Sequence, residues 1–365
     1  MTRNVKAAAA SLVVLFGAGI APGLAEAADL KPVRALIPVR IIDESYSPIN
    51  VAKYLGYFEE EGLDVTLQAV GGSNEAAIQI SAGNGDIGAA SPAQALIGMQ
   101  SATNMAIQYF YNMNYGNIWS ISVPPDSPIQ SISELQGKKI GVASMGSAGV
   151  TFGKAFVSRA GLNAERDVSF LSIGNGAQAV TAVRQKAVDA LAFWDAALAK
   201  FEVVGMEMRE LPVDPILASL PDVSLLARPE TIKNDPQMIE GFARAVAKGY
   251  DFTINNPEAA VAISWKMFPE AKPQGMSDAD ATAGGVKVIE RRMNIWKPTG
   301  PEGMHGYFQD KDWAQLVRFM MDEGLMTEEV PTSRIFTNDF IEAINTYDRE
   351  AVIASAKAFD QQSMK

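Results

Sequence analysis

The chain has 365 residues, 48% of them hydrophobic and 20% charged, which is typical of a well-packed globular protein and long enough for two lobes. A formal net charge of −11 without a Lys/Arg cluster argues against nucleic acid or an anionic membrane surface as a partner. The absence of cysteine excludes disulfides and thiolate chemistry, and the single histidine, His305, excludes a His-rich metal site. These absences favour a binding protein without catalytic residues, metal or cofactor over an enzyme.

Residues 1–27 are predicted to be a cleaved signal peptide. Basic residues at positions 3 and 6 precede an apolar run at 7–20, which is shorter than the roughly 20 residues of a membrane-spanning helix. Ala25 and Ala27 supply the small-x-small pattern that a signal peptidase accepts. The alternative is a permanent N-terminal membrane anchor. Because no cysteine follows position 27, we expect no lipid anchor and release into a periplasm.

The first part of the mature chain alternates strands with helices. Short apolar or alternating segments predict strands at 33–37, 63–69, 86–90, 106–111 and 118–123. Apolar residues at helical spacing predict a helix from Ile49 to Phe58 and another after Ser73. Pro48 and Pro92 are well placed in first helical turns, and a further helix is predicted from Pro92. Such alternation argues for a parallel sheet covered by helices on both faces.

A second series of the same kind follows. Strands are predicted at 140–142, 168–173 and 190–193. Helices are predicted from the end of the loop at 144–149 through Ala160, at 177–186 and at 196–203. A strand at 223–226 could cross back to the first series, and the rest of the chain is mostly helical, most clearly at 239–254, 257–267, 311–323 and 338–344. The fold class is therefore α/β, with two lobes that each hold a mostly parallel sheet flanked by helices, and a helical C-terminal segment.

The loops at the carboxyl ends of the predicted strands are the candidate ligand site, because ligands bind there in open parallel sheets. Most of these loops carry glycine or a hydroxyl residue beside a helix start, which lets a ligand approach free backbone N–H groups and favours an anionic or accepting group. The alternative for any single loop is that serine and glycine only cap helices and turn the chain. The loops are 45–47, 71–74, 91–93, 144–149, 175–176 and 194–195.

Three other patterns are weaker. The spacing G-x-G-x-x-G at 83–88 is rejected as a dinucleotide site, because a helix precedes it and a strand follows. Asp195 could be a catalytic carboxylate beside an aromatic wall formed by Trp194. Alternatively, Trp194 is a packed indole and Asp195 is a helix N-cap. His305 lies in a glycine-rich segment without a companion nucleophile or carboxylate motif, so we expect a solvent-exposed loop histidine.

Several segments resemble the nitrate/sulfonate/taurine-type substrate-binding proteins of ABC importers, a group that includes thiamine-pyrimidine-precursor receptors. The resemblance runs in order along nearly the whole mature chain, at 47–52, 56–65, 82–87, 135–142, 188–195 and 336–340. The second of these reads Gly-Tyr-Phe-Glu-Glu-Glu-Gly-Leu-Asp-Val, and the fourth ends in Gly-Lys-Lys-Ile-Gly-Val. Related fungal pyrimidine synthases carry a cysteine-rich motif, which this chain lacks.

The resemblance implies a type II periplasmic-binding-protein fold with a ligand cleft between two lobes. It implies that lobe I comprises residues 28–121 and 224–365, and that lobe II is an insertion at 122–223. The binding residues that it carries over lie on the loops described above: Tyr46, Gly72, Ser73, Ser91, Met145, Gly146, Ser147, Trp194 and Asp195.

The resemblance implies a monomeric solute-binding component of an ABC importer that captures a small polar or heteroaromatic molecule, of the sulfonate, taurine, nitrate or thiamine-pyrimidine type. Its partner would be an inner-membrane permease with its ATPase. If Asp195 faces the cleft, a simple anion would be repelled and an amine or heteroaromatic N–H would be favoured. The alternatives are an exported enzyme of the same fold acting on a small pyrimidine or amine, and a binding module for a sensory receptor.

Overall fold

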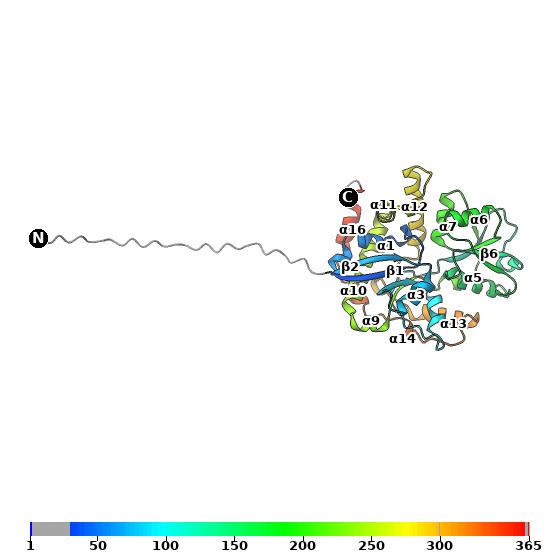
Figure 1. Ribbon diagram of the computed structural model, residues 1–365, viewed down its shortest axis with the longest axis horizontal. Helices are drawn as coiled ribbons and strands as arrows, with labels where there is room; N and C mark the ends of the chain where they lie inside the picture. Colours follow the sequence, from blue (N-terminus) through cyan, green and yellow to red (C-terminus); the bar gives the residue numbers. More distant parts are fainter. Residues whose placement is uncertain (2–29, 299, 362–363, 365) are drawn as a thin grey trace.

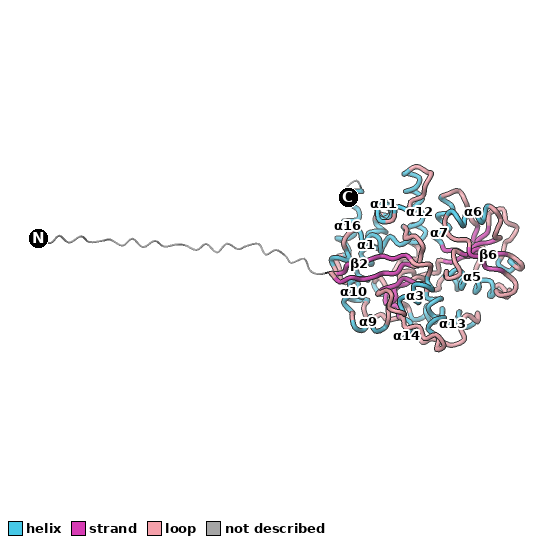
Figure 2. Tube along the Cα trace, viewed as in Figure 1, coloured by secondary structure: helices cyan, strands magenta, loops and turns pink. Residues whose placement is uncertain are grey.

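The computed structural model describes residue 1, residues 30–298 and 300–361, and residue 364. The predicted signal peptide lies, apart from its first residue, outside the described residues. The described chain forms two lobes that lie side by side, with β1 and β2 in the first and β6 in the second (Figure 1). Each lobe contains its own group of strands (Figure 2), and the predicted two-lobed α/β architecture is confirmed.

The sheet of the first lobe has the order β2-β1-β3-β10-β4. Its strands are β1 (Lys31–Ile37), β2 (Leu63–Ala69), β3 (Ile87–Ala90), β4 (Gln108–Asn112) and β10 (Ser224–Ala227). β1 is parallel to β2 and β3, whereas β10 is antiparallel to both of its neighbours, so four of the five strands point the same way. The central strands β3 and β10 are buried throughout because helices cover both faces of the sheet.

The sheet of the second lobe repeats this arrangement in the order β7-β6-β8-β5-β9. Its strands are β5 (Trp119–Val123), β6 (Lys139–Val142), β7 (Ser169–Ser172), β8 (Ala190–Trp194) and β9 (Arg209–Glu210). β6 is parallel to β7 and β8, and β5 is antiparallel to β8 and β9. Both sheets therefore present the carboxyl ends of parallel strands to loops that can meet between the lobes.

The chain passes between the lobes twice, after β4 and before β10. The two passages run beside each other: the Asn117 amide donates to the Ala218 carbonyl (3.1 Å) and the Asp222 amide to the Asn114 carbonyl (3.3 Å). Residue 122, the predicted start of the second lobe, lies inside β5, and residue 224 is the first residue of β10. The predicted lobe limits themselves stay a prediction.

Helices cover both sheets. The first lobe begins with the 3₁₀ turn η1 (Glu44–Tyr46), α1 (Ser47–Tyr54), α2 (Tyr57–Glu60), α3 (Ser73–Ser81) and α4 (Pro92–Met99). The second lobe has α5 (Ala148–Arg159), α6 (Ala177–Arg184), α7 (Asp195–Val203) and α8 (Pro215–Ala218). After β10 come α9 (Pro229–Asn234), α10 (Pro236–Asn255), α11 (Pro257–Met267), α12 (Asp278–Met293), α13 (Asp310–Asp322), α14 (Thr332–Ile335), α15 (Ile341–Ile344) and α16 (Arg349–Ala358). Among the residues that the structure describes, no helix is long and apolar enough to cross a membrane.

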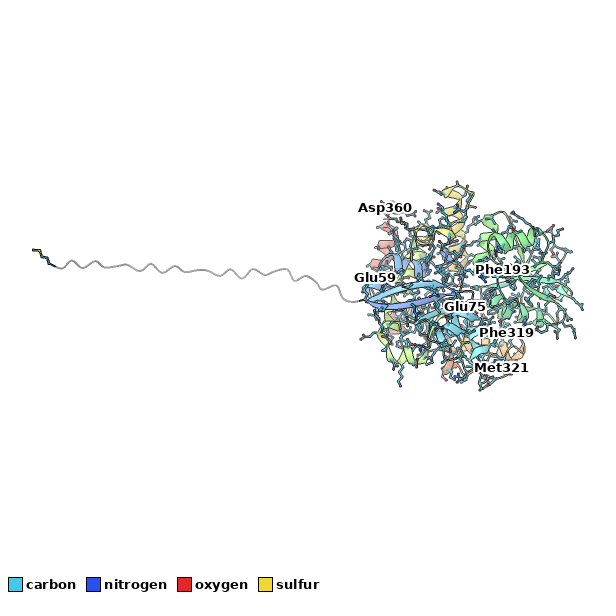
Figure 3. The ribbon with its side chains drawn as sticks, in the orientation of Figure 1. Glu59, Glu75, Phe193, Phe319, Met321 and Asp360 are labelled. Atoms are coloured by element: carbon cyan, nitrogen blue, oxygen red, sulfur yellow. The ribbon has the colours of Figure 1, made fainter. Side chains whose placement is uncertain are left out.

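The C-terminal helices build the first lobe and also reach the second. α10 packs against α1 and α16, so that residues far apart in the sequence share one core. Phe319 and Met321 on α13 lie in the first lobe, apart from Phe193 of the second (Figure 3). α12 packs against both α11 and α7, and it therefore joins the C-terminal helices to the second lobe.

His305 is buried, so the prediction of an exposed loop histidine is wrong. Its side chain is 2% exposed, its Nε2 atom lies 3.0 Å from Asp251 Oδ1, and its ring stacks on Tyr250 at 5.8 Å. Asp251 also accepts hydrogen bonds from Tyr347 (2.6 Å) and Arg349 (2.8 Å). Burial alone would raise the pKa of Asp251, but these donors hold it below its usual value. The histidine is thus part of a buried polar cluster.

Candidate ligand-binding site

A cavity of about 50 Å³, here called the inner cavity, lies between the lobes. The first lobe contributes the loops after β1 and β2 and the residue Val223 before β10. The second contributes the loops after β6 and β7 and the last residue of β8. Arg292 on α12 completes the lining. The cavity therefore occupies the edge where ligands bind in open parallel sheets, and it is built from both lobes.

Three aromatic side chains form its walls. Trp194 at the end of β8 meets Trp119 of β5 edge-on, with ring centroids 5.7 Å apart, and stacks on Phe193 at 5.5 Å. Tyr46 of η1 faces them from the first lobe and is 4% exposed. Burial raises the pKa of Tyr46 well above its usual value, so its hydroxyl stays protonated. No described residue hydrogen-bonds to this hydroxyl, which leaves it free to donate to a ligand.

Arg292 brings a guanidinium into the cavity. Its Nε donates to both carboxylate oxygens of Asp195, at 2.7 and 2.9 Å, and its side chain is 3% exposed. Burial opposes the charge on Arg292, but the carboxylate of Asp195 outweighs this cost and raises the pKa of Arg292. The two Nη atoms make no hydrogen bond to any described residue. Asp195 thus holds the arginine in place while its outer nitrogens remain available.

Hydroxyl and amide groups add further donors. Ser73 Oγ accepts from the Ser91 amide (3.0 Å), and Ser147 Oγ accepts from the Gly149 amide (3.2 Å). Each serine therefore keeps its hydroxyl hydrogen for another partner. Asn175 Oδ1 accepts from the Gly176 amide (2.7 Å), which leaves its NH₂ group free. Together with Arg292 these groups make the inner cavity rich in donors.

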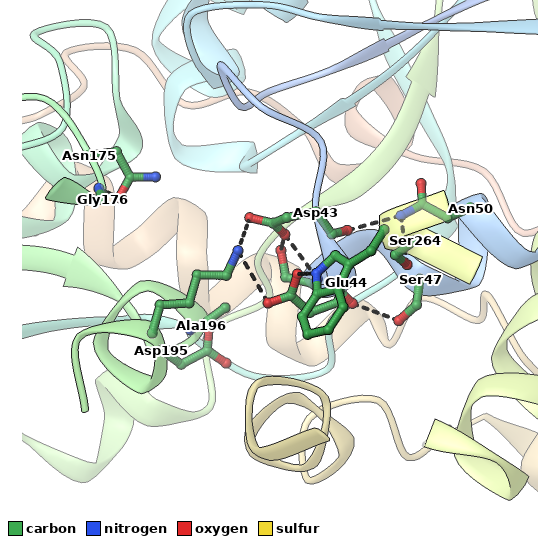
Figure 4. Close-up of polar contacts among 12 residues, drawn as sticks. Asp43, Glu44, Ser47, Asn50, Asn175, Gly176, Asp195, Ala196 and Ser264 are labelled. Atoms are coloured by element: carbon green, nitrogen blue, oxygen red, sulfur yellow. Dashed lines mark hydrogen bonds and ion pairs between the residues drawn. The ribbon is translucent and has the colours of Figure 1, made fainter. Parts of the chain in front are cut away.

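An ion-pair contact joins the lobes beside the cavity. Lys200 of α7 lies 2.8 Å from Asp43 Oδ2 and 3.2 Å from Glu44 Oε1, and Figure 4 shows these pairs around Asp43 and Glu44 as dashed lines. The two carboxylate side chains are 8% and 1% exposed, and Trp265 Nε1 donates to Glu44 Oε2 (3.1 Å). The side chains of this cluster and of the Asp195–Arg292 pair are together called the ion-pair contact. Its members are Asp43, Glu44, Lys200, Asp195 and Arg292.

The protonation of this cluster follows from burial and from Lys200. Burial would raise the pKa of Asp43, but the Lys200 ammonium and hydrogen bonds from Lys200 and Ser45 hold it below its usual value. Burial keeps the pKa of Glu44 raised despite Lys200. Burial disfavours the charged form of Lys200, but the carboxylates of Asp43 and Glu44 outweigh this effect and raise the pKa of Lys200. Asp43 and Lys200 are therefore the charged partners on which this contact depends.

A second contact between the lobes, called the loop contact, consists of Gly71, Gly72, Ser144 and Gly146. Ser144 Oγ donates to the Gly71 carbonyl (3.1 Å). Gly72 has φ +148°, a backbone conformation that favours glycine, and a Cβ placed there would lie 2.9 Å from the Gly146 carbonyl oxygen. The two loops therefore meet closely because Gly72 carries no side chain where the Gly146 carbonyl approaches it.

Five of the predicted binding residues line the inner cavity: Tyr46, Gly72, Ser73, Ser147 and Trp194. The other four lie elsewhere. Ser91 is fully buried behind Ser73, to which its amide donates. Met145 is 57% exposed, and Gly146 lines a groove outside the cavity. Asp195 does not line the cavity, because its carboxylate is engaged by Arg292. The role of all nine in binding stays a prediction.

Sequence reasoning missed Trp119 and Arg292 as cavity residues. Trp119 lies in a segment predicted as a strand, and the start of that strand gave no sign of a binding loop. Arg292 lies on α12, which was not among the predicted helices. A signal for this helix was present: Ser277 caps it through the Asp280 amide (3.1 Å), and two arginines stand in its last turn.

The family profile described as NMT1/THI5 like matches residues 44–260. The riboflavin-binding protein RibY of Chloroflexus aurantiacus is 26% identical over 227 residues, which are 59% of this chain and 59% of that protein. The chain thus matches about three-fifths of the length of this curated relative.

Solved structures share the fold. The alkanesulfonate-binding protein SsuA from Xanthomonas axonopodis pv. citri, bound to MOPS, matches with a TM-score of 0.66 and 16% identity over 85% of this chain and 99% of that chain. The periplasmic nitrate-binding protein NrtA from Synechocystis PCC 6803 matches with a TM-score of 0.58 and 13% identity over 92% of this chain and 91% of that chain. The two-lobed architecture is therefore the periplasmic-binding-protein fold, as the sequence predicts.

Proposed function

The chain belongs to the NMT1/THI5-like family, and from this membership and the donor-rich cavity we propose that it is the solute-binding component of an ABC importer. It works in the periplasm after removal of the predicted signal peptide. It captures one small molecule between its lobes and delivers it to a membrane permease that is driven by an ATPase. Lobe closure is favoured by contacts that the ligand makes only when both lobes reach it.

The ligand carries an anionic or acceptor-rich head group. The observation that carries this proposal is Arg292, whose Nη atoms have no partner among the described residues while Asp195 fixes its Nε. Tyr46 and the serines add donors around it, and a sulfonate or carboxylate accepts such bonds in several directions. The engagement of the Asp195 carboxylate by Arg292 favours an anionic or acceptor head group over an amine. The related structures include binders of an alkanesulfonate and of nitrate, both anions, which supports the same class here.

Both lobes contribute to the capture. Tyr46 and Ser73 approach the ligand from the first lobe, and Ser147 and Trp194 approach it from the second. A ligand that bonds to both sets stabilises the closed arrangement and not an open one. The aromatic walls exclude water and strengthen the hydrogen bonds to the head group.

Native mass spectrometry of the freshly purified mature protein tests the proposal first, because a tight ligand survives purification. A thermal-shift screen of sulfonates, carboxylates, nitrate, pyrimidines and riboflavin follows. A ligand at 100 times its Kd adds about 2.7 kcal/mol of stability and raises the melting temperature measurably. Stoichiometric capture of an acceptor-bearing compound is the expected result. Turnover of that compound, or selective binding of amines without an acceptor group, would contradict it.

A further inference from the structure

A second space adjoins the inner cavity. This outer groove has a volume of about 480 Å³, and its polar side chains include Arg40, Asn74, Gln79 and Asn84. Arg40, Gly71 and Ser144 line both the groove and the inner cavity. The two spaces therefore meet at the loop contact, where one hydrogen bond and a close approach of two glycines separate them.

The difference in volume bears on the size of the ligand. About 50 Å³ accommodates a compact head group such as a sulfonate, whereas sites that enclose whole drug-sized ligands measure roughly 300–1,000 Å³. A ligand larger than its head group needs further space when the lobes are closed. The outer groove is the adjoining space, and opening the Ser144–Gly71 hydrogen bond would connect the two.

The groove is equipped for an anionic end group. Arg40 is exposed and forms no ion pair or hydrogen bond with any described residue, and the side-chain amide of Asn84 is equally free. The carboxylate of Glu75 is already engaged, because its Oε2 accepts from the Gly71 amide (2.8 Å). Ile78, 49% exposed, gives the groove an apolar stretch between these polar groups.

We propose that the outer groove is a second subsite that binds the anionic tail of an elongated ligand, with Arg40 as its specificity-determining residue. This inference rests on the proposed function, in which the inner cavity binds the head group. The ligand class is an acid with a compact oxyanion head, a short apolar stem and a second anionic group. The stem would pass between Gly71 and Ser144 and lie along Ile78.

Isothermal titration calorimetry with two matched probe series tests this subsite. The first series is linear alkanesulfonates of two to eight carbons, and the second is the ω-carboxyalkanesulfonates of the same lengths. We expect the carboxyl group to raise affinity about tenfold in the longer members and not in the shortest. Arg40→Gln should reduce this ratio to about one, and Asn84→Asp should bring it below one. Arg34→Gln is the control, because it removes the same charge from an exposed site that lines neither space.

Each other outcome overturns the inference in a distinguishable way. If alkanesulfonates bind and the carboxyl group adds nothing at any length, the groove is no subsite and the proposed function stands. If Arg40→Gln impairs uptake by the permease while the affinity ratio is unchanged, Arg40 is a contact for the transporter instead. If neither series binds, the anionic head group of the proposed function fails, and the tail subsite that rests on it fails as well.

Discussion

The two contacts that join the lobes differ in kind. The ion-pair contact uses five ionisable side chains that lie largely out of solvent, whereas the loop contact uses glycines and one serine hydrogen bond. A buried charge that loses its partner is costly, so removal of any one partner from the ion-pair contact destabilises the protein. The second contact depends on shape, and a single added methyl group disturbs it. The ion-pair contact therefore holds the lobes together by charge, and the loop contact determines how closely the two loops approach each other.

The largest loss of stability is expected when Lys200 is removed from the ion-pair contact. Lys200→Met leaves Asp43 and Glu44 buried beside each other without a counter-charge, which typically costs about 3–5 kcal/mol. Urea unfolding measures the loss. Lys154→Met removes a lysine whose partner Glu165 is 76% exposed, and its cost should be about 0–1 kcal/mol. Equal losses in the two variants would show that the buried pairing of Lys200 has no special weight.

A pH dependence should arise from Asp222, which lies near Arg292 and Asp195 of the ion-pair contact. Burial raises the pKa of Asp222 to about 7. The folded protein then keeps a proton that the unfolded chain loses near pH 4, so this group's stabilising contribution is lost as pH rises from about 4 to 7. The loss is on the order of 3–4 kcal/mol.

Asp222→Asn should abolish this loss, since asparagine keeps the oxygen that accepts from the Val223 amide (2.7 Å). Urea unfolding between pH 4 and 8 compares the two proteins. Asp278→Asn, at an exposed carboxylate paired with Lys272, should leave the wild-type slope in place. A wild-type stability that rises over this interval relative to Asp222→Asn would refute the assignment.

The binding part of the ion-pair contact is Arg292. Arg292→Gln removes the proposed anion donor and also leaves Asp195 unpaired, so the double variant Asp195→Asn/Arg292→Gln separates the two effects. Both variants should bind the ligand found by native mass spectrometry more weakly by about 2–3 kcal/mol, and calorimetry measures this. Arg291→Gln removes the neighbouring arginine, which pairs with Glu202 at 3.1 Å, and should bind normally. Normal binding by the double variant would exclude Arg292 from recognition.

Gly72→Ala should disturb the loop contact. Its methyl group would lie 2.9 Å from the Gly146 carbonyl oxygen, so the loops can no longer meet as closely. We expect a loss of about 1 kcal/mol in stability and weaker ligand binding. Gly62→Ala also changes a glycine with positive φ (+76°), but its added methyl group would meet no atom of the described residues within 4 Å. It should lower stability similarly and leave affinity intact, and a loss of affinity in both variants would assign the effect to backbone strain alone.

Much of the fold could be predicted because the signals are local. β2 was predicted residue for residue at 63–69, and the prolines at the first turns of α1 and α4 correctly marked helix starts. Loops that contain glycine and serine follow the strands, and the sequence therefore pointed to those cavity residues that lie on such loops. These include Gly72, Ser73 and Ser147.

The rest depends on partners that are distant in sequence. Arg292 becomes a cavity residue because α12 packs on α7 and Asp195 holds it, and 97 residues separate the pair. His305 was mistaken for an exposed residue because its glycine neighbours are typical of loops, while its partner Asp251 lies 54 residues earlier. Asp195 was predicted either as a carboxylate of the site or as a helix N-cap, and it is the first residue of α7. The sequence alone could not show that its carboxylate pairs with Arg292, because that pairing depends on how α12 packs on α7.

The position of β10 has a consequence for the order in which the lobes can form. The second sheet is complete once β9 ends at Glu210, whereas β4 has no strand neighbour in the first sheet until β10 is made at 224–227. The helices α10 and α11, which pack on α1, come later still. During synthesis the later part of the chain must therefore be available before the first lobe can close its core. A chain that ends before residue 224 therefore lacks one of the two central strands of the first sheet, whatever the state of the second.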